Sequence, residues 1–127
     1  MNIAEIFAAL DTVPAETPLA FMNIKTREKT YALSGNAHSH RGTHSQYAFD
    51  KSSGDHKITA EEFRDELTWE LENTKTFEWS GNLGQGPSYS LDLDTKIAIT
   101  EDYRDSEGTI LTWYATDEEM IFFTDAL

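Results

Sequence analysis

The chain has 127 residues, of which 39% are hydrophobic and 12% aromatic. This composition is typical of one globular domain, residues 1–127, and excludes a disordered chain. The absence of cysteine excludes disulfides, thiolate zinc sites and cysteine nucleophiles. No apolar run approaches the ~18 residues of a membrane span, and the N-terminus lacks the features of a signal peptide. We therefore expect a cytoplasmic protein with no membrane partner.

The formal net charge of −13 is carried by one part of the chain. Residues 1–57 contain six acidic and six basic side chains, whereas residues 58–127 contain seventeen acidic and four basic ones. Such a charge repels nucleic acid and attracts basic surfaces. It predicts no direct nucleic-acid partner and is compatible with a basic protein partner, although solubility alone also explains it.

The first predicted element is a helix that ends near Asp11. A capping box of Asn2 and Glu5 opens it, and its apolar stripe comprises Ile3, Ile6, Phe7 and Leu10. Strands are expected over residues 19–24 and 29–34, joined as a hairpin, and over residues 46–50 after a polar loop at 34–45.

A second capping box, Thr59 and Glu62, opens a helix that runs to about Asn73. Its inward residues are predicted to be Phe63, Leu67 and Leu71, with Trp69 partly inward. The remaining predicted strands cover residues 76–79, 89–93, 96–100, 109–115 and 120–124. This order predicts an α+β fold, with a mostly antiparallel sheet and two helices packed on one face.

The segment HSHRGTHSQYAF, residues 38–49, contains three of the four histidines. His38, His40 and His44 could chelate zinc, nickel or iron with help from His56 or Asp50. A solvated polar loop explains the same spacing, so we assign no metal or other cofactor.

Arg41 and Gly42 can be interpreted as ligand-binding residues. Glycine allows close approach of a ligand to the backbone, and the arginine fork suits phosphate or carboxylate. The segment SGNLGQGPS, residues 80–88, could add an anion-binding nest of backbone amides. The alternative is that both segments are simple turns and that Arg41 pairs with a carboxylate.

The second helix is strongly acidic. Glu62, Glu66 and Glu70 follow an i, i+4, i+8 spacing, with Glu61 and Asp65 beside them. Like charges at this spacing destabilise a helix by a few tenths of a kcal/mol per pair. Carboxylates roughly 6 Å apart along a helix could mimic a row of phosphates, so a partner-binding face is predicted at Glu62, Asp65, Glu66 and Glu70. A solvated face is the alternative.

Catalytic patterns are weak. Asp92 and Asp94 would share one face of a strand as an acid/base pair, but this pattern is common near turns. Ser39 and His44 lack the glycine pattern of a nucleophile elbow. We therefore favour a non-enzymatic protein.

The segment SHRGTHSQYAF, residues 39–49, resembles the S-Y-R-G-x-Y-x-x-L-A motif of a family of small, functionally uncharacterised proteins encoded by bacteriophages and some bacteria. ITAEEFRDEL, residues 58–67, resembles the family's T-V-x-E-L-L-x-x-L helix. KTFEWSGNLGQGPSYSLDLDTKIAI, residues 75–99, resembles its T-F-x-G-Y-K-G-G-E-Y-x-M-x-x-x-T-P-L-W-V segment, and PLAF at 18–21 resembles its first strand.

This resemblance implies site residues by position. Arg41, Gly42, Gly81, Gly84 and Tyr89 match the family pattern. His40 and His44 stand where the family has tyrosines, so metal binding through these rings is not a family property. Leu83 stands in place of a loop lysine, which puts in doubt any role needing a second cation.

Two functions follow as expectations. The first is a phage-type accessory protein that acts in counter-defence in the host cytoplasm and binds an anionic, nucleotide-like molecule. The ligand site could lie at the subunit interface of a homo-oligomer. The expected ligand-binding residues are His40, Arg41, Gly42, His44, Gly81, Gly84 and Tyr89. The alternative is an acidic DNA mimic whose 59–73 helix blocks a basic nucleic-acid-binding host protein.

Overall fold

The computed structural model describes residues 1–39, 46–52, 54–74, 76–81, 84–100 and 107–125. Its two helices are α1 (Ile3–Leu10) and α2 (Ala60–Asn73). Both begin at the predicted capping boxes: the Asn2 and Thr59 side chains accept from the backbone N–H of Glu5 and Glu62, whose carboxylates accept in return. Local signals therefore set both helix starts correctly.

The strands form two sheets. The larger sheet has seven strands in the order β2-β1-β9-β8-β7-β4-β3, with bounds β1 (Leu19–Asn23), β2 (Lys29–Thr30), β3 (Leu33–Ser39), β4 (Gln46–Lys51), β7 (Lys96–Thr100), β8 (Glu107–Ala115) and β9 (Met120–Thr124). The smaller one is a hairpin of β5 (Thr76–Gly81) and β6 (Gly84–Ser90).

The predicted α+β fold is confirmed, and the sheet is mixed rather than purely antiparallel. Among the described strands, four of the six pairings in the larger sheet are antiparallel. The β1–β9 and β4–β7 pairings are parallel. Parallel pairing joins strands that lie far apart in the chain, so local sequence patterns do not reveal it.

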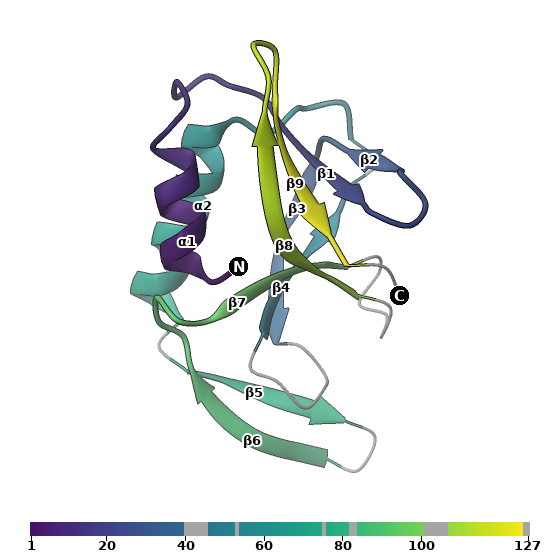
Figure 1. Cartoon of the computed structure of the whole chain (residues 1–127). Coiled ribbons are helices and arrows are strands. Elements are labelled where there is room, and N and C mark those ends of the chain that lie inside the picture. The colour runs from purple at the N-terminus through teal and green to yellow at the C-terminus, as the bar shows by residue number, and fades with distance from the viewer. Residues whose placement is uncertain (40–45, 53, 75, 82–83, 101–106, 126–127) are drawn as a thin grey trace.

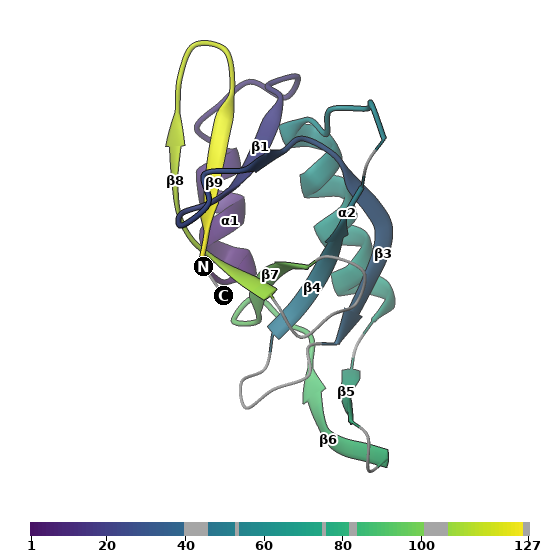
Figure 2. The same ribbon diagram turned by 90° about the vertical axis from the view of Figure 1, so that its right-hand side faces the viewer.

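The larger sheet curls, and both helices lie together on one side of it (Figure 1). In the perpendicular view the helices lie behind the curled sheet, while the β5–β6 hairpin projects away from the rest of the chain (Figure 2). Four phenylalanines fill the space between the helices and the sheet: Phe21, Phe49, Phe63 and Phe122. The Phe63 ring lies with its centroid 5.5 Å from that of Phe21 and 5.9 Å from that of Phe49. This ring fixes α2 against the sheet.

Three strand predictions need correction. Residues 34–39, predicted as a polar loop, form most of β3 and pair with β4. Residues 84–90, predicted mainly as a glycine loop, form β6. Both segments lack apolar alternation, and pairing with a neighbouring strand satisfies their backbone groups instead.

The predicted strand over residues 89–93 ends at Ser90, and Asp92 and Asp94 lie in the turn that follows. The Asp94 N–H donates to Asp92 Oδ1 at 2.9 Å. This is an Asx-turn arrangement, so the two carboxylates do not share a strand face as an acid/base pair.

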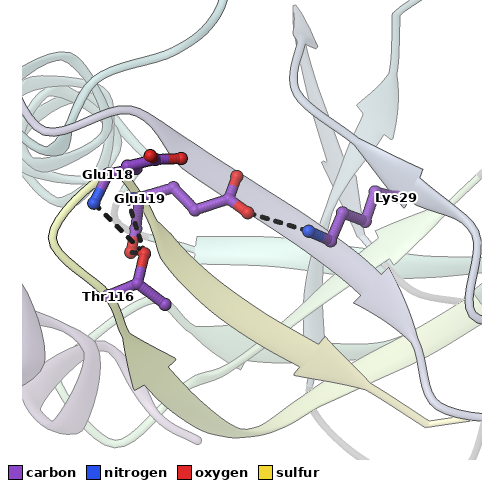
Figure 3. Close-up of polar contacts among 4 residues, drawn as sticks. All are labelled: Lys29, Thr116, Glu118 and Glu119. Atoms are coloured by element: carbon purple, nitrogen blue, oxygen red, sulfur yellow. Dashed lines mark hydrogen bonds and ion pairs between the residues drawn. The ribbon is translucent and has the colours of Figure 1, made fainter.

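The turn between β8 and β9 is acidic and is organised by the Thr116 side chain. Thr116 Oγ1 accepts from the backbone N–H groups of Glu118 and Glu119 at 3.2 and 3.1 Å. Lys29 Nζ lies 2.8 Å from Glu119 Oε1 and ties β2 to this turn (Figure 3). The hydrogen bond to Glu119 raises the pKa of Lys29.

In the part of the chain that the structure describes, no helix has the length and apolar character needed to cross a membrane.

Candidate functional site

The residues predicted to bind an anionic ligand fall in two places. His40, Arg41, Gly42 and His44 lie outside the described residues. Gly81 and Gly84 face each other across the β5–β6 hairpin, and Tyr89 is paired with Phe77. Strand β3, which ends one residue before His40, contacts β5.

The acidic helix is the functional candidate that the structure describes best. Five of its exposed residues form what we call the α2 outer face: Glu61, Glu62, Asp65, Trp69 and Glu72. Asp65 precedes Trp69 by four residues and Glu72 follows it by three, so both carboxylates are its neighbours on the helix surface.

Trp69 differs most from its prediction. Its side chain is 56% exposed, whereas the sequence analysis placed it partly inward. The buried arc of α2 comprises Phe63, Leu67 and Glu70, a spacing of four and then three residues that directs Trp69 away from the core. A large aromatic ring therefore lies on the acidic surface.

Glu70 also differs from its prediction, because it is only 5% exposed. Its Oε2 accepts from the Tyr47 hydroxyl at 2.7 Å and from Thr74 Oγ1 at 3.0 Å. Burial, followed by the hydrogen bond to Glu70, raises the pKa of Tyr47 far above its ordinary value. Glu70 thus joins α2 to β4 and lies too deep to present its carboxylate to a partner.

A cavity of about 220 Å³ lies beside the N-terminal half of α2. It is lined by an apolar set (Ala32, Leu33, Phe49, Ile58) and a more polar set (Ser52, Gly54, His56, Glu62, Glu66). The segment that bounds it is held at both ends, since the Ser52 N–H donates to the Ala32 carbonyl and the Ile58 N–H to the Tyr31 carbonyl. The cavity is smaller than the ~300–1,000 Å³ of pockets for drug-sized ligands.

Glu62 is held firmly at this cavity. Its Oε1 accepts from the Thr59 N–H at 3.1 Å, and its Oε2 lies 2.7 Å from His56 Nε2. The hydrogen bond from His56 is the main reason that the pKa of Glu62 is lowered. The contacts with Thr59 and His56 orient this carboxylate.

Glu66, one turn along α2, has the opposite electrostatic environment. Burial and then the charge of Glu70 raise its pKa. Within the described residues no hydrogen bond or ion pair engages its carboxylate. Two glutamates with oppositely shifted pKa values therefore share one cavity, an arrangement that often marks a functional site.

Ser52 and His56 both line the cavity. Ser52 Oγ accepts from the Gly54 N–H at 3.0 Å, and within the described part of the chain no hydrogen bond joins Ser52 to His56. A nucleophile needs such a contact with its base.

The other flank of α2 holds a cation of its own. Arg64 donates to the Phe7 carbonyl at 3.0 Å, pairs with Asp11, and lies 5.0 Å from the centroid of the Phe7 ring. On this flank, Arg64 is the positive partner of both the Phe7 ring and the Asp11 carboxylate. Among the described residues that line the cavity with Glu62 and Glu66, there is no lysine or arginine.

Sequence reasoning found Glu62, Asp65 and Glu66 but missed the cavity. Leu33, Phe49 and Ile58 come from three separate segments, and nothing in their local patterns shows that they meet. Among the described residues, no group of three or more histidine, aspartate or glutamate side chains is placed to hold a metal ion. His56 lies with Glu62, and His40 and His44 fall outside those residues.

Comparison with known proteins gave no match to a protein-family model, a curated protein or a solved structure.

Proposed function

We propose that this protein is a non-enzymatic binding protein whose α2 outer face docks a basic surface of a partner protein. The observation that carries the proposal is the exposure of Trp69 between Asp65 and Glu72. Tryptophan is enriched among the residues that dominate binding energy at protein interfaces. Its ring face also attracts lysine and arginine.

The charge of the chain supports a basic partner. The net charge of −13 raises the rate at which a positively charged protein meets this surface. Arg64, the one basic residue of α2, is directed to Asp11 and Phe7 on the flank, so it does not neutralise Asp65 or Glu72. A nucleic-acid-binding protein has the kind of surface that such a row of carboxylates would occupy.

The test is a display selection of random dodecapeptides on the immobilised protein. We expect enrichment of peptides rich in lysine and arginine. Trp69→Ala should weaken their binding at least tenfold, because truncating an interface tryptophan removes both ring packing and cation–π attraction. Tyr114→Ala is the matched control, since Tyr114 is an equally exposed aromatic (61%) on β8.

Either of two results would overturn the proposal. One is a selection that enriches no basic peptide. The other is a set of basic peptides that bind the Trp69→Ala and Tyr114→Ala variants equally well. Asp65→Asn with Glu72→Gln should also flatten the salt dependence of binding, because both carboxylates contribute to electrostatic attraction.

A second proposal is the anionic ligand site, favoured by the contact between β3 and β5. In a phage-type counter-defence protein this site would sequester a nucleotide signal. Native mass spectrometry with a panel of linear and cyclic nucleotides tests it, with Arg41→Ala as the control variant. A mass increment that disappears in the variant is expected, and no increment with any nucleotide would refute it for that panel.

A further inference from the structure

We propose that the cavity beside α2 receives a lysine side chain of the basic partner, with the alkyl stem on Leu33, Phe49 and Ile58 and the ammonium between Glu62 and Glu66. This inference rests on the proposed function and adds a defined anchor to it. The size of the cavity, about 220 Å³, suits one side chain and is too small for a nucleotide-sized ligand.

The lining matches both ends of a lysine. The apolar side chains provide a surface for a four-carbon stem, which lysine often buries while its charge stays near polar groups. The two carboxylates project from α2 one turn apart, so one ammonium can contact both. Adjacent apolar and carboxylate surfaces of this kind fit an alkylammonium better than a fully polar cation.

The state of each carboxylate favours lysine over arginine. Each oxygen of Glu62 already has one contact, from the Thr59 N–H or from His56, so a guanidinium fork would have to share both oxygens with these groups. A compact ammonium with three donors needs no such parallel pair. Glu66 has no partner within the described residues and provides the open acceptor.

The chain holds a comparable cation elsewhere. On the opposite flank of α2, Arg64 lies over the Phe7 ring and pairs with Asp11. The cavity repeats that combination of apolar surface and carboxylate, and its described lining contains no lysine or arginine. The raised pKa of Glu66 agrees with a partly buried charge, which a positively charged guest would stabilise. Among the described residues, the titratable groups near Glu66 are Glu62, Glu70 and His56.

The experiment uses n-butylammonium as a probe and follows the side-chain carboxyl signals of the ¹³C-labelled protein by NMR. We expect a saturable shift of the Glu66 and Glu62 signals and a fall in the Glu66 pKa toward its ordinary value. Glu66→Gln should weaken the probe at least tenfold. Glu118→Gln, which removes an exposed carboxylate from the β8–β9 turn, outside both the cavity and the α2 outer face, should leave probe binding unchanged.

Two control compounds separate the effect of charge from the effect of shape. n-Butanol should give no saturable shift, and n-butylguanidinium should bind more weakly than the ammonium. Equal loss in both variants, equal binding of the guanidinium, or a shift that does not saturate would overturn the proposal. The probe does not contact Trp69, so an absence of probe binding would refute the lysine site and would not bear on the α2 outer face. A failed peptide selection would refute the α2 outer face and would not change the result obtained with the probe.

A second experiment tests whether a lysine of a bound peptide enters the cavity. In a selected basic peptide, each lysine is replaced in turn by norleucine, which keeps the four-carbon stem and removes the ammonium group. We expect one replacement to abolish the Glu66 shift and to weaken the peptide at least tenfold. If every single replacement leaves the Glu66 signal shifted as before, the lysine anchor is wrong.

Discussion

Replacing Tyr47 with phenylalanine tests how α2 is attached to the sheet. The hydroxyl of Tyr47 donates to the buried Glu70 carboxylate at 2.7 Å, while its ring packs edge-on against Phe49 with centroids 6.1 Å apart. Tyr47→Phe keeps the ring and removes only the donor. A hydrogen bond to a charged group contributes about 1.5–3 kcal/mol. Thr74 Oγ1 still donates to the same oxygen, so we expect a loss of about 2 kcal/mol in the free energy of unfolding.

Urea denaturation followed by circular dichroism measures this loss. For a domain of this size the slope is about 1–3 kcal/mol per molar urea, so the midpoint should fall by roughly 1 M. Tyr114→Phe is the matched control, because the same oxygen is removed from an exposed ring, and it should change stability by less than about 0.5 kcal/mol. Equal midpoints for the two variants would refute the assigned role of the Tyr47 hydroxyl.

The same pair of residues predicts a pH dependence. The pKa of Tyr47 is raised in the folded state by burial first and by Glu70 second. A folded pKa above the unfolded value of about 10 means that the stabilising contribution is complete below that pH. It is lost as the pH rises through the folded pKa. The difference between wild type and Tyr47→Phe should therefore stay constant between about pH 6 and pH 9.

Three further predictions concern other parts of the fold. Gly108→Ala should destabilise the protein by about 1–3 kcal/mol, because a Cβ there meets the Asp125 carbonyl at 2.8 Å; Gly54→Ala, which meets only Ser52 Oγ at 3.2 Å, is its control in thermal melts. Thr59→Ala removes the α2 cap and should cost about 1 kcal/mol, measured by urea denaturation; an unchanged midpoint would contradict the capping assignment. His56→Ala should raise the Glu62 pKa toward its ordinary range in an NMR titration, because His56 is the main cause of its depression, and an unmoved Glu62 titration would show that His56 does not hold it.

The parts of the fold that sequence predicts well are those with local causes. The capping boxes at Asn2 and Thr59 and the apolar spacing of both helices lie within a few residues. The strands at the C-terminal end alternate clearly or are continuously apolar. By contrast, β3 and β6 are held by pairing with another strand, and the energy of that pairing depends on which segment is adjacent. Their own side chains provide little signal.

The candidate site divides in the same way. Glu62, Asp65 and Glu66 were found because charge and helical spacing are visible in the sequence. The cavity they border was not, because Leu33, Phe49 and Ile58 meet only when the 52–58 segment returns along residues 31–32. Burial is a property of the assembled fold, and no single segment encodes it.

The inversion of two residues on α2 carries the functional argument. Hydrophobicity alone places Trp69 inward and Glu70 outward. However, the helix buries the side on which Phe63 and Leu67 lie, and that side includes Glu70 and excludes Trp69. The buried carboxylate is compensated by Tyr47 and Thr74, so its position costs little stability. The exposed tryptophan has no comparable compensation, since its ring gains nothing from water. A partner that covers it would recover that burial energy, and the carboxylates around it are the reason that we propose a basic partner.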